Sequence, residues 1–232
     1  MTQTVHTSRE YEAELREIRG HLTSMGARCE QALAIAIEAF LNGDQQQADA
    51  VMRLDERINQ DEIQIDEIAV HVLALRQPVA YDLRFVARTL KFVTDLERIS
   101  DEAVNIAERA IALAAMHVSP PTYHVPHMAV ITREMLRIAL DSFVAGDVEA
   151  AKKVLSMDDE VDELLRQTSA TAIAWMQQNP HGVAAMMCVT STAKYLERIA
   201  DHATNLAEHV VFLVEGDDVR HRAAATKSIE PP

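Results

Sequence analysis

The sequence predicts an all-α protein made of two tandem, pseudo-symmetric three-helix bundles. Turn-forming residues are scarce, with 6 Gly and 7 Pro among 232 residues. Hydrophobic residues make up 48% of the chain but aromatic residues only 4%. Most of the hydrophobic residues are Ala, Leu, Ile, Val and Met, and Ala, Leu and Met are good helix formers. An internal repeat is the third observation, and together the three exclude all-β and doubly wound folds.

The repeat is visible at two places in the chain. The segment 32–59 aligns with 135–162 at an offset of 103, and Gly43-Asp44 coincides with Gly146-Asp147. Further on, the segment 96–108 aligns with 196–208 at an offset of 100, and nine of the 13 positions are identical. Several of these identities are polar, so they exceed what two unrelated amphipathic helices would share.

Glycine, aspartate and proline mark the helix ends. Each Gly-Asp pair suits a helix C-cap followed by the N-cap of the next helix. Pro78 and Pro180 end the second helix of each copy, because proline cannot continue the hydrogen-bond ladder. The helices are expected at 8–41, 45–76, 80–116, 127–144, 148–178 and 182–215.

These helices give the expected domain organisation. Residues 1–116 form the first bundle, and residues 127–216 form the second. A proline-rich linker, 117–126, separates them, and the aperiodic tail 217–232 is expected to be disordered. Short connections make neighbouring helices antiparallel.

Charge and composition exclude several classes of protein. Lys plus Arg is 22 and Asp plus Glu is 36, for a net charge of −14, which argues against nucleic-acid binding. The N-terminus has no basic and apolar signal pattern, and no run is long enough to span a membrane. Cys29 and Cys188 are interpreted as buried free thiols. We therefore expect a cytoplasmic protein without membrane insertion.

Paired carboxylates are the candidate functional residues. Glu97 and Asp101 lie four residues apart, on one helical face, as do Glu197 and Asp201. The second helix of each copy carries companions beside an apolar stripe, namely Asp55, Asn59, Glu62 and Asp66 in the first copy and Asp158 and Asp162 in the second.

A groove between two such helices would present four or more oxygen ligands, which hard cations prefer. The predicted metal residues are Asp55, Asn59, Glu62, Asp66, Glu97, Asp101, Asp158, Asp162, Glu197 and Asp201. The alternative is that these acids form solvated faces neutralised by Arg98 and Arg198. No Glu-x-x-His pair, phosphate loop or catalytic triad order is present, so the sequence predicts no enzyme.

The two aligned segments 96–108 and 196–208 closely resemble the signature of the PhoU family, the accessory proteins of bacterial phosphate-specific transport. Asp82-Leu83-Arg84 and the duplicated layout extend the resemblance over almost the whole chain. The resemblance implies a cytoplasmic, usually dimeric, non-enzymatic repressor of phosphate uptake and of the phosphate-starvation response. It also implies an adaptor between the transporter ATPase subunit and a sensor histidine kinase.

Family members carry Glu/Asp-x-x-x-Asp motifs that hold metal ions. Glu97/Asp101, Asp158/Asp162 and Glu197/Asp201 match this motif, whereas Asp55 is followed by Asn59 instead of aspartate. The second-copy site is therefore expected to be the better formed. Candidate ions are Mg²⁺, Mn²⁺, Ca²⁺, Zn²⁺ and iron. Two alternatives stay open, a helical scaffold without metal and a carboxylate-bridged metalloenzyme.

Overall fold

The computed structural model describes residues 3–116 and 118–216, and all its regular elements are helical. Predictions for the tail 217–232 and for residue 117 of the linker lie outside the described residues. The helices are α1 (Gln3–Asn42), α2 (Gln45–Arg76), α3 (Ala80–Ala114), α4 (Val125–Ala145), α5 (Val148–Gln178) and α6 (Val183–Glu215), with a 3₁₀ turn, η1 (Pro180–Gly182), before α6.

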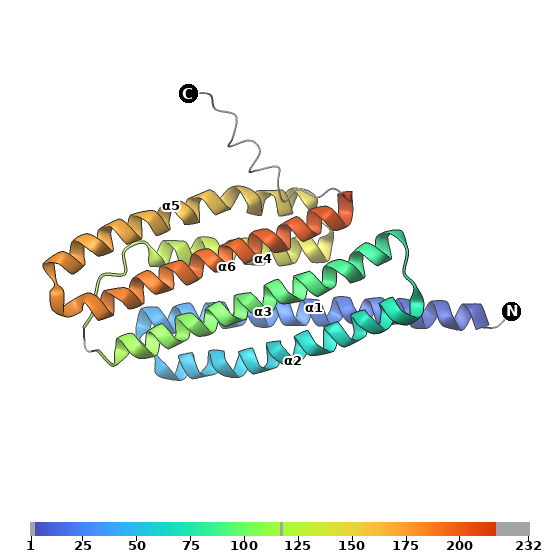
Figure 1. Ribbon diagram of the computed structural model, residues 1–232, viewed down its shortest axis with the longest axis horizontal. Helices are drawn as coiled ribbons and strands as arrows, with labels where there is room; N and C mark the ends of the chain where they lie inside the picture. Colours follow the sequence, from blue (N-terminus) through green and yellow to red (C-terminus); the bar gives the residue numbers. More distant parts are fainter. Residues whose placement is uncertain (1–2, 117, 217–232) are drawn as a thin grey trace, which may run out of the picture.

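The six helices form two three-helix bundles, which confirms the predicted fold class (Figure 1). α1, α2 and α3 pack together as one bundle, and α4, α5 and α6 pack as the other. The bundles meet mainly along α3 and α6, the third helix of each, while α1 and α4 make a smaller contact. Because the bundles are copies, this arrangement places equivalent helices against each other across the seam.

Helix ends follow the predicted signals closely. Gly43 and Gly146 have φ of 68° and 66°, the left-handed region that glycine adopts without strain. The Asp44 side chain accepts hydrogen bonds from the backbone N–H groups of Gln46 and Gln47, and Asp147 accepts one from Ala150. α1 begins at Gln3 instead of near residue 8, because no proline or glycine interrupts the chain there.

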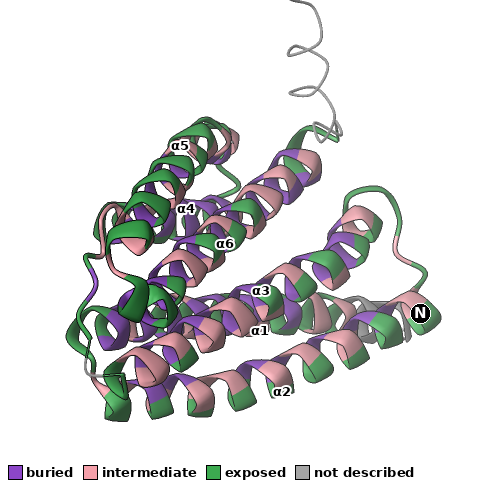
Figure 2. Ribbon diagram, turned by 60° about the vertical axis from the view of Figure 1, so that its left-hand side comes forward, coloured by how far each residue is buried: buried purple, intermediate pink, exposed green. Residues whose placement is uncertain are grey.

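Large apolar side chains on the inward faces form one continuous core. Figure 2 shows the buried residues on the faces that the helices turn towards one another. The repeated heptad-like stripe supplies much of it, with Leu96, Ile99 and Ile106 on α3 and Leu196, Ile199 and Leu206 on α6 all fully buried. Burying each such side chain stabilises the fold by about 1.5–3 kcal/mol. Cys29 and Cys188 are buried free thiols, as predicted.

The outward faces of α2 and α5 are exposed and polar over much of their length (Figure 2). Within residues 3–116 and 118–216, no helix is long and apolar enough to cross a membrane.

Candidate functional site

The first acidic face comprises Asp55, Asn59, Glu62 and Asp66 on α2 with Glu97 and Asp101 on α3. All six side chains lie beside the apolar stripe and are partly buried, as the periodicity predicts. Asn59 donates a hydrogen bond to Asp55 Oδ2 at 3.2 Å, and Ser100 donates one to Asp55 Oδ1 at 2.7 Å. Asp55 is therefore satisfied within the protein, and Asn59 acts as its partner.

The other carboxyls of this face are poorly compensated. Burial raises the pKa of Glu62, and Asp66 and Asp101 raise it further. Burial and Asp101 likewise raise the pKa of Glu97. The Oδ1 atom of Asp66 is buried and has no hydrogen-bond partner among the described residues. These groups hold mutually repelling negative charge that a cation would neutralise.

The second acidic face comprises Asp158 and Asp162 on α5 with Glu197 and Asp201 on α6. Partial burial of the carboxyl, followed by repulsion from Glu197, Asp158 and Asp162, raises the pKa of Asp201 to about 6, although the residue as a whole is exposed. Burial and Asp162 also raise the pKa of Asp158, which accepts a hydrogen bond from Thr204 at 3.4 Å. The structure thus brings all four predicted residues together.

Each acidic face also contains one cationic side chain. Arg98 lies 3.4 Å from Glu97 and 4.0 Å from Asp101 in the first face. In the second face, both carboxylate oxygens of Glu197 accept from Lys194, at 2.6 and 2.5 Å. Arg198 instead crosses to the other bundle and contacts Glu102 at 3.1 Å. Arg98 therefore lies beside its own acidic face, whereas Arg198 pairs away from its face, because the repeat has diverged at residues 94 and 194 and at 102 and 202.

The oxygen donors suit a hard cation by their chemistry. As the side chains lie, however, no group of three or more His, Cys, Asp or Glu side chains within the described ranges is arranged to hold a metal ion. Asn59 and Lys194 already occupy some of the carboxylate oxygens. Holding an ion would therefore require rotation of these side chains.

A second polar cluster lies on the seam between the bundles, and the sequence did not predict it. Asp95 Oδ1 of α3 lies 2.8 Å from His202 Nδ1 and accepts a hydrogen bond from Asn205 at 3.1 Å. Asp95 Oδ2 lies 3.1 Å from His209 Nε2. Thus His202 faces Asp95 and not the acidic groove beside Asp201. Burial opposes ionisation of Asp95, but His202 and His209 outweigh it and lower the pKa of this carboxyl to about 2.

A sequence signal for this cluster exists in the repeat itself. His202 stands where the first copy has Glu102, and Asp95 stands where the second copy has Tyr195. Positions at which the two copies of the repeat carry different residues therefore indicate where the two bundles make contacts that are not symmetric.

The two bundles each match the same known domain. A family model described as the PhoU domain matches residues 22–110 and again residues 125–210. The chain belongs to the PhoU family. A "Phosphate-specific transport system accessory protein PhoU homolog" from Pseudomonas putida is 41% identical over 219 residues, covering 94% of this chain and 86% of that protein.

Solved PhoU structures have the same fold. The crystal structure of PhoU from Pseudomonas aeruginosa matches with a TM-score of 0.87 and 38% identity, covering 89% of this chain and all of that one (100%). The phosphate transport system regulatory protein PhoU from Streptococcus pneumoniae matches with a TM-score of 0.82 and 25% identity, covering 90% of this chain and 99% of that one. These relatives are named as accessory or regulatory proteins and not as enzymes.

Proposed function

We propose that this PhoU protein is a non-enzymatic adaptor that represses phosphate uptake and the phosphate-starvation response. It acts in the cytoplasm as a homodimer and contacts the transporter ATPase subunit and the sensor histidine kinase. The observation that carries the proposal is the match of both PhoU repeats, together with relatives named for phosphate transport. An adaptor shifts a partner's state only as far as it binds one state more tightly than another.

The two acidic faces are the proposed regulatory surfaces. Both lie between the second and third helices of a bundle, and both hold carboxyls whose pKa is raised by burial and by neighbouring acids. A divalent or ferric ion bound there would add two or more positive charges and alter the contact offered to a partner. We propose that Asp158, Asp162, Glu197 and Asp201 hold such an ion after Lys194 leaves Glu197.

Gene repression in cells tests the adaptor role. Deletion is expected to derepress phosphate-uptake genes at high phosphate, and a folded variant with Glu97→Gln, Asp101→Asn, Glu197→Gln and Asp201→Asn should at least partly mimic deletion. The matched control neutralises four exposed acids elsewhere, Glu12, Asp49, Glu67 and Glu149, and should repress normally. Continued repression in the deletion strain, or no pull-down of either the ATPase or the kinase, would contradict the proposal.

Elemental analysis tests the ion site separately. After incubation with Mn²⁺ or Fe³⁺ and desalting, the Glu197→Gln/Asp201→Asn variant should retain less metal than the wild type. Lys194→Met removes the competing cation and should retain more. Equal metal content in all three proteins would refute the ion site and leave the adaptor role untouched.

A further inference from the structure

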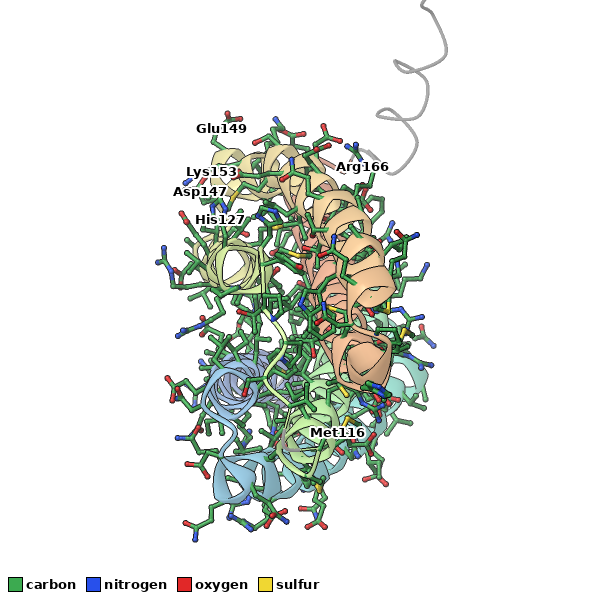
Figure 3. All side chains as sticks on the ribbon, turned by 90° about the vertical axis from the view of Figure 1, so that its left-hand side faces the viewer. Met116, His127, Asp147, Glu149, Lys153 and Arg166 are labelled. Carbon is green, nitrogen blue, oxygen red and sulfur yellow. The ribbon has the colours of Figure 1, made fainter. Side chains whose placement is uncertain are left out.

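Helices α1 and α4 touch at one point and are separated by a groove next to it. A Cβ atom built on Gly26 would lie 2.7 Å from Leu140, so the two helices approach closely there. One to two turns further along α1, the helices enclose a groove of about 450 Å³. Viewed along the helices, α4 lies over α1 on one side of the molecule and α6 over α3 on the other (Figure 3). The groove thus belongs to the side opposite the main seam.

The groove has an apolar floor and charged walls. Leu33 and Leu136 at its base are fully buried, whereas Val130 on its rim is 64% exposed. Glu30 lines the α1 wall, and Arg133 and Arg137 line the α4 wall one helical turn apart. Glu134 also lines the groove and pairs with Lys153 at 3.4 Å.

The charges in this groove are incompletely satisfied within the chain. Burial raises the pKa of Glu30, and neighbouring Asp141 raises it further, while Arg137 and Arg133 oppose the shift. Within the described ranges, neither Glu30 nor Arg133 forms an ion pair, and Arg137 makes only an exposed contact of 3.3 Å with Asp141. A carboxylate on one wall and two guanidinium groups on the other therefore face the same space.

A groove with a negative wall and a positive wall can pair with a second copy of itself, because the negative wall of one copy can face the positive wall of the other. In a twofold dimer, the same patch meets its copy, so residue i of one chain contacts residue j of the other and the reverse. If the twofold axis runs parallel to the groove, the α1 wall of one copy meets the α4 wall of the other, which would bring Glu30 of each chain towards Arg133 and Arg137 of its copy. The rest of the chain carries a net charge that disfavours association, since the protein is at −14 overall.

We propose that the α1–α4 groove is the surface through which two copies of this chain associate, with Glu30 of one copy paired with Arg133 and Arg137 of the other. This inference rests on the proposed homodimeric adaptor and assigns the surface that it uses. Val130 of each copy supplies an apolar contact at the rim.

Charge-reversal variants test the proposed surface. The dissociation constant of the dimer is measured by light scattering and sedimentation velocity over a range of protein concentrations. The Arg133→Glu/Arg137→Glu variant should dimerise with a dissociation constant raised about tenfold or more, because each reversed pair occurs twice in the dimer. Adding Glu30→Arg to that variant restores opposite signs across the interface and should recover most of the affinity. Arg57→Glu/Arg166→Glu makes the same change in net charge at exposed sites on other helices and should dimerise like the wild type.

The outcomes are distinguishable. A wild-type dimer that is unaffected by Arg133→Glu/Arg137→Glu, or a triple variant no stronger than the double one, would overturn this surface while leaving the adaptor role standing. A wild-type protein that is monomeric at every concentration would overturn the dimer as well. Circular dichroism of each variant confirms that the helices are intact.

Discussion

Asp95 of α3 and His209 of α6 lie 3.1 Å apart, between Oδ2 and Nε2, and join the two bundles through a contact that the repeat does not duplicate. The imidazole is buried, packs against the ring of Phe92, and has a buried Nδ1 atom with no hydrogen-bond partner among the described residues. His202 and Asn205 approach the same carboxylate from α6. One acid on the first bundle therefore holds three polar groups of the second.

Asp95→Asn is expected to lower the free energy of unfolding by about 2 kcal/mol, because charge-assisted hydrogen bonds are stronger than neutral ones and the partners stay buried. Urea denaturation at pH 7 measures the loss. Asp141→Asn, whose side chain is 70% exposed, is the control and should be close to neutral. A loss no larger than that of the control would show that the cluster adds no stability.

The stabilisation that Asp95 provides is expected to be lost in acid. Its pKa is lowered to about 2, below an ordinary value near 3.9, so its stabilisation is complete above about pH 4 and disappears as the pH falls towards 2. The difference in unfolding free energy between wild type and Asp95→Asn should therefore shrink over that window. A difference independent of pH between 2 and 5 would contradict the assignment.

The contribution of Asp201 to the free energy of unfolding is expected to have the opposite pH dependence, at higher pH. Its pKa is raised to about 6, so the folded protein favours the protonated acid, and stability falls as the pH rises from about 4 through 6. Asp201→Asn should flatten this part of the stability profile measured by urea denaturation. Asp141→Asn again serves as the control, and an unchanged slope in Asp201→Asn would argue against a strained acidic face.

Gly182, in the turn before α6, is expected to be intolerant of a side chain. A Cβ atom there would lie 2.3 Å from the Trp175 ring, and the ring must move to admit it. Gly182→Ala should cost about 1–3 kcal/mol by thermal or urea unfolding. Gly20→Ala, in α1 with nothing within 4 Å of the added Cβ, should instead stabilise by about 0.5–1 kcal/mol.

Both cysteines should be unreactive in the folded protein. Burial raises the pKa of Cys29 strongly and that of Cys188 as well, so neither thiol ionises readily near neutral pH. A chromogenic aromatic disulfide that reacts with free thiols should label both cysteines only after denaturation. Fast labelling of Cys29 in the native state would indicate that the α1–α3 contact, where its Sγ lies 3.3 Å from the Leu96 carbonyl oxygen, opens readily.

Local chemistry in the sequence determined the helices, their ends and the membership of each acidic face. Gly43 with Asp44 ends one helix and begins the next through backbone geometry and a cap, which depend on neighbouring residues alone. Glu197 and Asp201 share a face because of the helical period, and the repeat indicates equivalent positions in both bundles.

Only the tertiary structure decided which groups meet across the seams. Arg198 contacts Glu102 of the other bundle, and Asp95 contacts residues more than 100 positions away, such as His202. Periodicity shows which side of a helix is covered, but not which helix covers it or in what register. Those choices arise when two bundles with diverged side chains pack against each other, because buried polar groups then take whatever partners the seam provides.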